Sequence, residues 1–162
     1  MPYFQDLSDY AYHYSGVRPG TQNVGWLMSD HVFATADPTE HLLDTLWRFC
    51  KVSVVQMRGV HECDFCPPKI GSYFVQRGGE NLLTGTSEIR AFGADGAIYA
   101  APTLIYHYVL AHRYAPPEAF LRALNDGPAP PDQAFFDRLM QLDLEWNPTS
   151  APAEKPVRQL PK

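Results

Sequence analysis

Apolar residues recur at helical spacing after residue 37, next to residues that favour a helix start. The stretch Asp37-Pro38-Thr39-Glu40 is typical of a capping box, and it predicts a helix with Asp37 as the N-cap residue. One stripe of this helix collects four apolar side chains, Leu43, Leu46, Trp47 and Cys50. We therefore interpret Cys50 as a thiol of the hydrophobic core.

Three further helices are predicted in the second half of the chain. Pro102 opens a helix that runs to about Arg113. Pro116-Pro117-Glu118 opens another, which ends at Gly127. The last begins at Pro131-Asp132, and its apolar face carries Phe135, Leu139, Leu142 and Trp146.

The region between the first helix and Pro102 has the pattern of strands. Its β-branched and alternating stretches are residues 52–57, 72–76, 81–84, 87–92 and 97–99. Two turn signals, Arg77-Gly78-Gly79-Glu80 and Gly93-Ala94-Asp95-Gly96, separate them into hairpins. This pattern predicts a meander of about four short antiparallel strands. Strands followed by a run of helices favour the α+β class, with the small sheet packed against helices.

The two ends of the chain differ from its middle. Residues 1–36 are rich in aromatic residues, Gly and Pro without a helical period, which predicts an extended segment that wraps the core. Residues 147–162 are rich in Pro and poor in bulky apolar residues, which predicts a C-terminal tail. We therefore expect a single domain over residues 1–146.

Length and charge narrow the function classes. A chain of 162 residues is about the size of one domain, and a formal net charge of −5 argues against a nucleic-acid or anionic-membrane surface. No apolar run approaches the roughly 20 residues of a membrane span. The first residues lack the basic and apolar regions of a secretory signal, so the expected compartment is the cytoplasm. A protein partner is compatible with these features.

The stretch His61-Glu62-Cys63-Asp64-Phe65-Cys66 carries the clearest chemistry. Two cysteines separated by two residues in a loop can present both thiolates to one zinc ion, with each sulfur about 2.3 Å from the metal. A closed structural site needs two more ligands, and Cys50 is assigned to a helix face. The sequence thus predicts a structural Zn²⁺ site whose remaining ligands are histidines or a carboxylate.

His61, His107 and His112 are the histidines favoured as further ligands. His107 and His112 lie five residues apart, so on an ideal helix they diverge by about 140° and at most one should reach the same metal. The plainest set is Cys63, Cys66, His61 and His107, and the alternative replaces His61 with His112. His13, His31 and His41 have no spacing that favours them.

The cysteine pair also has other interpretations. Two reduced thiols without a metal are compatible with the pattern. A thioredoxin-like redox pair begins a helix, whereas Cys66 is followed by Pro67-Pro68. A deaminase-type zinc site needs a His-x-Glu spacing, which is absent because Glu62 directly follows His61.

The chain resembles a family of small uncharacterised bacterial proteins over roughly residues 2–125. The motifs that carry the resemblance include Pro19-Gly20-Thr21-x-Asn23-Val24-Gly25-Trp26-Leu27 and Arg58-Gly59-x-His61-x-Cys63-x-Phe65-Cys66. Two more are Gly85-x-Ser87-Glu88-Ile89-Arg90 and Tyr99-Ala100-Ala101-Pro102-x-Leu104-Ile105-x-His107-Tyr108, which continues to His112-x-Tyr114-x-Pro116-Pro117. The resemblance implies that the cysteine loop and both helical histidines belong to one recurring pattern. It implies no catalytic residues.

These observations leave two classes of function. The first is a zinc-stabilised binding or accessory protein, which would meet a protein partner through its aromatic N-terminal segment or its acidic surface. The second is a small zinc-dependent hydrolase with the metal at its centre. A closed four-ligand site favours the first class, whereas an open coordination position near Glu62 or Glu88 favours the second.

Overall fold

Strands β4 (Glu88–Phe92) and β5 (Ile98–Pro102) form the centre of the fold, and every residue in both strands is buried. They pair antiparallel, with Arg90 opposite Ala100. Strand β1 (Thr21–Asn23) lies on the other side of β5 and runs parallel to it, which gives the order β1-β5-β4. The computed structural model describes residues 2–12, 19–67 and 74–146, and within them it confirms the α+β class.

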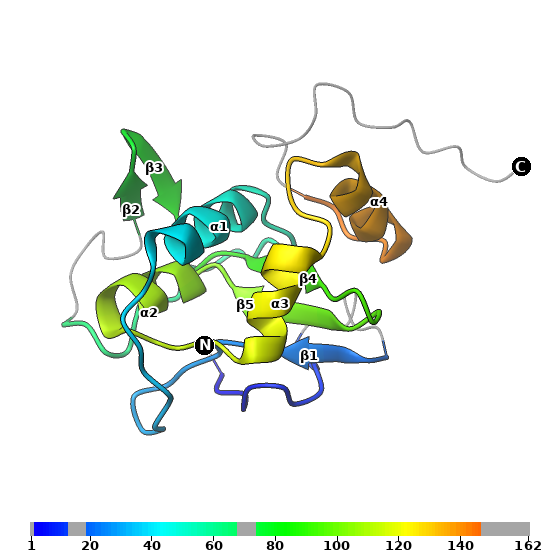
Figure 1. Ribbon diagram of the computed structural model, residues 1–162. Coiled ribbons are helices and arrows are strands. Elements are labelled where there is room, and N and C mark those ends of the chain that lie inside the picture. Colours follow the sequence, from blue (N-terminus) through cyan, green and yellow to red (C-terminus); the bar gives the residue numbers. More distant parts are fainter. Residues whose placement is uncertain (1, 13–18, 68–73, 147–162) are drawn as a thin grey trace, which may run out of the picture.

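Four helices pack around this sheet (Figure 1). Helices α1 (Glu40–Lys51) and α3 (Glu118–Asp126) contact β4, and α2 (Ile105–His112) packs against α1. Helix α4 (Gln133–Gln141) adds Phe135, whose ring contacts both Phe49 and Phe92. Cys50 is buried on α1, as its position in the apolar stripe predicts.

Two of the predicted helix starts are displaced. The N-cap residue of α1 is Thr39, not Asp37, because the Thr39 hydroxyl accepts the hydrogen bond from the Leu42 amide at 3.1 Å. Asp37 instead forms an exposed ion pair with Arg113. Pro102 is the last residue of β5, where its missing N–H costs little, and α2 begins at Ile105.

The predicted strands form two sheets rather than one meander. The first hairpin is confirmed as β2 (Phe74–Arg77) and β3 (Glu80–Leu83), and its turn residues Gly78 and Gly79 both have positive φ. This hairpin packs against α1 through Arg77, which contacts Glu40 and Asp44. It forms a two-stranded sheet separate from that of β4. In residues 52–57 only Val54 pairs, in isolated bridges with Glu88 and Trp146. Residues 72 and 73 of the predicted strand lie outside the described residues.

The N-terminal segment lies against the central sheet. Phe4 pairs with Trp26 in an isolated bridge, and the rings of Tyr10 and Trp26 are buried beside Ala100 of β5. Asp6 accepts hydrogen bonds from the Gly25 amide and the Tyr114 hydroxyl, both at 2.8 Å. Tyr10 and Trp26 are therefore used in packing, whereas Phe4 is only partly buried.

Tyr10 also completes a buried polar cluster with Glu88 and Arg90 of β4. Its hydroxyl donates to the Glu88 carboxylate at 2.9 Å, and Arg90 Nη1 donates to the same carboxylate at 2.6 Å. Glu88 is 1% exposed and Arg90 is fully buried. Burial and the Glu88 charge raise the pKa of Tyr10, so its hydroxyl stays protonated as a donor. We call these three residues the Glu88–Arg90 cluster.

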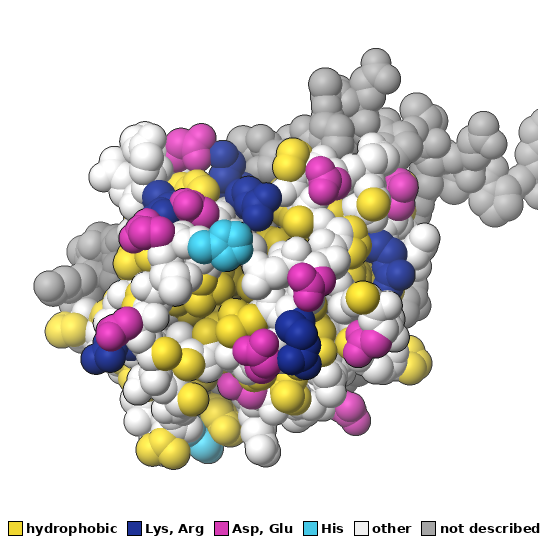
Figure 2. All heavy atoms as spheres, in the orientation of Figure 1, with side chains coloured by type: hydrophobic (Ala, Val, Ile, Leu, Met, Phe, Trp, Pro, Cys, Tyr) yellow, Lys and Arg dark blue, Asp and Glu magenta, His cyan; other side chains and the backbone are white. Residues whose placement is uncertain are grey.

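The surface shows no strong separation of charge on the face drawn in Figure 2, where basic and acidic side chains are interspersed. Lys51 contacts Glu80, and Arg122 contacts Glu118 one turn away. Among the described residues, no helix has the length and apolar character needed to cross a membrane. The predicted tail, residues 147–162, lies outside the described part of the chain.

Candidate metal centre

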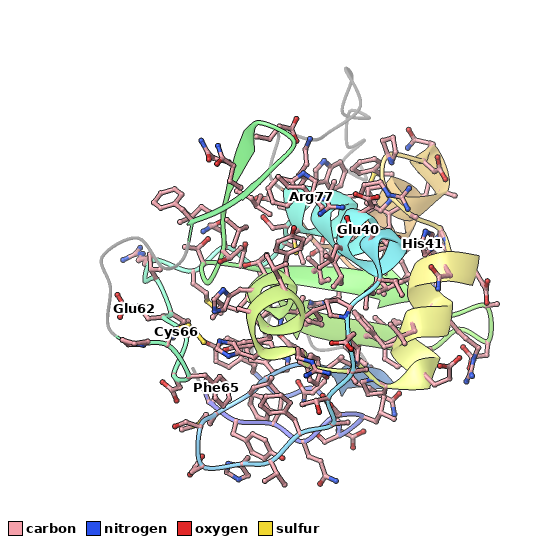
Figure 3. The ribbon with its side chains drawn as sticks, turned by 60° about the vertical axis from the view of Figure 1, so that its left-hand side comes forward. Glu40, His41, Glu62, Phe65, Cys66 and Arg77 are labelled. Carbon is pink, nitrogen blue, oxygen red and sulfur yellow. The ribbon has the colours of Figure 1, made fainter. Side chains whose placement is uncertain are left out.

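The cysteine loop brings two thiols to one side of a tight turn. The Cys66 amide donates to the Cys63 carbonyl at 3.2 Å, which closes the turn between them. Cys63 is 5% exposed, Cys66 is half-buried, and neither is in a disulfide. Figure 3 shows the Cys66 side chain reaching toward α2, whereas Glu62 lies on the outer side of the loop.

Helix α2 brings two imidazoles to the same point. His112 Nε2 lies 3.2 Å from Cys63 Sγ and 3.2 Å from His107 Nε2. Cys66 Sγ lies 3.4 Å from Nε2 of both histidines. The four ligand atoms of Cys63, Cys66, His107 and His112 all lie within 4.8 Å of one another. We call these four residues the metal cluster.

The expectation that at most one of these histidines could reach the site is wrong. The angle of about 140° describes where the Cα–Cβ bonds point on an ideal helix. His112 is the last residue of α2, and Arg113 then turns the chain in the left-handed conformation at φ 57°. Both side chains are long enough to bend toward a point beside the helix, and their ring centroids are 5.1 Å apart.

The position of the cysteine loop relative to α2 is set by Gly85. The Gly85 carbonyl accepts from the His61 amide at 2.8 Å, just before the cysteine pair. The Gly85 amide donates to Thr103 Oγ1 at 3.0 Å, just before α2. Gly85 has φ 78°, and a Cβ added to it would lie 2.3 Å from the His61 carbonyl oxygen. Glycine is thus required where the two ligand-bearing segments meet.

The separations within the cluster match those of ligands around one zinc ion. Tetrahedral bonds of about 2.3 Å to sulfur and 2.0–2.1 Å to nitrogen place neighbouring ligand atoms roughly 3.3–3.8 Å apart. Four of the six separations are 3.2 to 3.4 Å, at or just below the short end of this range. A small outward movement of the side chains would therefore accommodate the ion.

Burial favours the uncharged forms of Cys63, His107 and His112. It raises the pKa of Cys63 to about 11 and lowers the pKa of both His107 and His112. His107 is lowered further by the neighbouring His112. Neutral imidazoles can bind a metal directly, and a divalent cation would displace the thiol protons.

His61 is placed away from the cluster. Its Nε2 lies 3.4 Å from the Tyr12 hydroxyl, and its ring is not among the converging ligand atoms. His31 stacks on Tyr3, and His41 Nε2 lies 3.0 Å from Asn125 Oδ1. His13 lies outside the described residues. The structure thus brings together the alternative predicted set, with His112 in place of His61.

Aromatic side chains surround the cluster, and sequence reasoning did not assign them to it. Phe65, between the two cysteines, packs its ring against Phe33, Tyr108 and His112. Thr103 and Gly85 were also not identified as positioning residues. The available signal was Gly85 itself, three residues before β4, but nothing in one sequence distinguishes that glycine from a turn residue.

A groove of about 450 Å³ lies elsewhere, between α1, β3 and residues 53–56. None of the four cluster residues lines it. Glu62 is exposed on the far side of the loop, and both carboxylate oxygens of Glu88 accept from Tyr10. Neither carboxylate belongs to the group of converging ligand atoms.

Comparison with known proteins places most of the chain in one family. A family model described as a domain of unknown function, DUF7919, matches residues 2–125. This range contains all four residues of the metal cluster. Neither a search of curated proteins nor a search of solved structures found a match.

Proposed function

Because the chain belongs to the DUF7919 family of unknown function, we propose a function from the site itself. The metal cluster binds one Zn²⁺, which fixes the cysteine loop to α2 in a zinc-stabilised binding or accessory protein. The observation that carries the proposal is the convergence of four ligand atoms, from Cys63, Cys66, His107 and His112, within 4.8 Å.

The chemistry of the ligand set supports zinc. Two thiolates and two imidazoles in a tetrahedral arrangement form a common structural zinc site, whereas Mg²⁺ and Ca²⁺ prefer oxygen ligands. Cys63 and His107 are buried, so the ion would be partly shielded from water. Cys66 and His107 are 41 residues apart, so the site is not preformed in the unfolded chain and metal binding would contribute to folding.

A structural role is better supported than a hydrolytic one. A catalytic zinc keeps one coordination position for water, and it usually has three protein ligands. Here a fourth side chain is in place, and the groove lies away from the cluster. The four-ligand arrangement favours the binding or accessory class over the hydrolase.

Two histidine variants test the ligand set. We expect untagged parent protein to hold one zinc per chain, measured by elemental analysis after dialysis against a weak chelator. His112→Ala should lose most of this zinc and melt at a lower temperature. His61→Ala, from the same region but directed toward Tyr12, should retain both zinc and melting temperature more closely.

The opposite results have distinct meanings. Absence of zinc in the parent, even after incubation with zinc salts, would contradict the metal site. Loss of zinc from His61→Ala with retention in His112→Ala would restore the other ligand set. One zinc lost without any change in melting temperature would contradict the structural role and favour the hydrolase class.

A further inference from the structure

We infer that Cys63 and Cys66 form an oxidation switch, in which a peroxide converts the two thiolates to a disulfide and the zinc ion leaves. This inference rests on the zinc site proposed above and concerns its regulation. It differs from a thioredoxin-type exchange reaction, because the pair is held by a metal and does not begin a helix.

The local backbone allows the disulfide to form without moving other elements. The 3.2 Å hydrogen bond from the Cys66 amide to the Cys63 carbonyl closes a four-residue turn. Such a turn keeps the two Cα atoms within about 7 Å, close to the range that disulfides span. Both sulfur atoms already belong to a group of ligand atoms within 4.8 Å. Side-chain rotation alone can therefore bring them together.

The two thiols differ in access to solvent, which fixes the order of events. Cys66 is half-buried, whereas Cys63 is only 5% exposed. A small oxidant meets Cys66 first, and Cys63 is the neighbour that resolves the product. An accessible thiol beside a resolving thiol is the usual arrangement of a redox sensor.

The chemical steps balance with hydrogen peroxide as the oxidant. The Cys66 thiolate attacks one peroxide oxygen, so an S–O bond forms, the O–O bond breaks, and the departing hydroxide takes up a proton. The Cys63 thiolate then attacks this sulfur, so the S–S bond forms and the S–O bond breaks with loss of a second hydroxide. In total, two thiolates, one peroxide and two protons give one disulfide and two waters.

Oxidation removes half of the zinc ligands. His107 and His112 remain, and two imidazoles from one helix are too few for a closed site. The loop then keeps its hydrogen bond from His61 to Gly85 and the packing of the Phe65 ring. The expected consequence is zinc release with local loosening of residues 61–67, while the central sheet stays folded.

The third cysteine provides a matched control. Cys50 is 2% exposed, and its sulfur lies 3.7 Å from the Thr103 carbonyl oxygen in the core. It is not part of the group of converging ligand atoms. Cys50→Ala should therefore respond to peroxide as the parent does.

The test uses the full chain loaded with zinc, exposed to hydrogen peroxide in the presence of a chromophoric zinc chelator. We expect one zinc released per chain, together with a mass decrease of about 2 Da in the metal-free chain. Dithiothreitol and added zinc should restore both the original mass and the zinc content. Cys50→Ala should give the same results.

A second variant keeps the metal but removes the resolving sulfur. Cys63→His retains four zinc-type ligands, and its zinc content is measured first. Where zinc is bound, peroxide should release it at least about tenfold more slowly and with no loss of 2 Da. Equal release from this variant would overturn the inference.

The outcomes separate this inference from the proposed zinc site. A parent chain that binds no zinc contradicts the proposed function itself. A parent chain that binds zinc but keeps it under peroxide, or releases it only with oxygen atoms added to the thiols, leaves the zinc site intact and overturns the switch.

Discussion

The metal cluster and the Glu88–Arg90 cluster both bring polar side chains together within the fold, but these side chains are satisfied in different ways. The metal cluster links the cysteine loop to α2, and the Glu88–Arg90 cluster links the N-terminal segment to β4. In the Glu88–Arg90 cluster the chain supplies the opposite charge, because Arg90 donates to the Glu88 carboxylate. In the metal cluster all four side chains are electron-pair donors. In the function proposed above, a cation from outside the chain completes that second arrangement.

This difference separates two sources of stability. The Glu88–Arg90 cluster is complete when the chain has folded, apart from Arg90 Nε and Nη2, which have no partner among the described residues. With zinc bound as proposed, the stability that the metal cluster contributes depends on the concentration of a free ion. Changes in the sequence should therefore affect the first most strongly, whereas chelators should affect only the second.

The largest expected effect follows removal of Glu88. Glu88→Ala leaves the fully buried Arg90 without its carboxylate partner, and breaking such a pair costs about 3–5 kcal/mol. Tyr10→Phe removes one hydrogen bond to the same carboxylate and should cost about 1–2 kcal/mol. Urea unfolding of the zinc-loaded variants measures both. An equal decrease in the free energy of unfolding for both variants would contradict the expectation that the Glu88–Arg90 ion pair contributes more than the Tyr10 hydrogen bond.

Loss of zinc should have the next largest effect. Cys63→Ser, Cys66→Ser and His107→Ala should each lower metal content and melting temperature together. At a free zinc concentration a thousand times the dissociation constant, the lost stabilisation is about 4 kcal/mol. Thermal melting with and without a chelator measures it. His41→Ala is the control, because His41 is exposed and contacts Asn125. A chelator effect on melting that persists in the cysteine variants would refute the assignment of Cys63 and Cys66 as zinc ligands.

A smaller effect is expected where Gly85 joins the two ligand-bearing segments. Gly85→Ala forces a side chain into the left-handed conformation and against the His61 carbonyl, and should cost about 2 kcal/mol and weaken zinc binding. Gly96→Ala has a similar φ of 87° but open space around it, so it should cost about 1 kcal/mol and leave zinc affinity unchanged. Zinc titration and urea unfolding would distinguish them. Similar zinc affinity in both variants would disprove the positioning role of Gly85.

The smallest effect concerns pH and Cys50. Burial raises the pKa of the Cys50 thiol from 9.0 to about 12. Between these values the unfolded chain has lost this proton while the folded chain keeps it, so stability falls as pH rises. The free energy of unfolding decreases by at most about 1.4 kcal/mol per pH unit above pH 9. Urea unfolding at several pH values should show a shallower decline for Cys50→Ala, and parallel declines would argue against a neutral buried thiol.

The sequence predicted the elements that carry local signals. The two glycines of the β2–β3 turn, the Pro117 and Gly127 ends of α3, and Asp132 at the start of α4 were all read correctly. Their positions depend on backbone preferences that a single residue expresses. The spacing of Cys63 and Cys66 likewise identified the metal site's loop, because the requirement for two nearby thiolates is local.

Features that depend on distant contacts were not predicted. Strand β1 has three residues, too few for an alternating pattern, and it exists because β5 offers it hydrogen bonds. Thr39 caps α1 in place of Asp37, and Asp37 instead pairs with Arg113, which is distant in the sequence. The choice of His112 over His61 depends on the turn after α2 and on Tyr12, which approaches His61 from 49 residues away.

The parallel pairing of β1 with β5 also sets the earliest point at which β1 can join the central sheet during synthesis. Thr21 pairs with Ile98, so β1 lacks its β5 partner until 77 more residues have been made. At about 5–20 residues per second this takes roughly 4–15 s. Throughout that interval β1 has only its contacts with residues 7–10, and Tyr10 and Trp26 lack their burial against Ala100. The first part of the chain to be synthesised therefore cannot dock on the central sheet until β5 has been made.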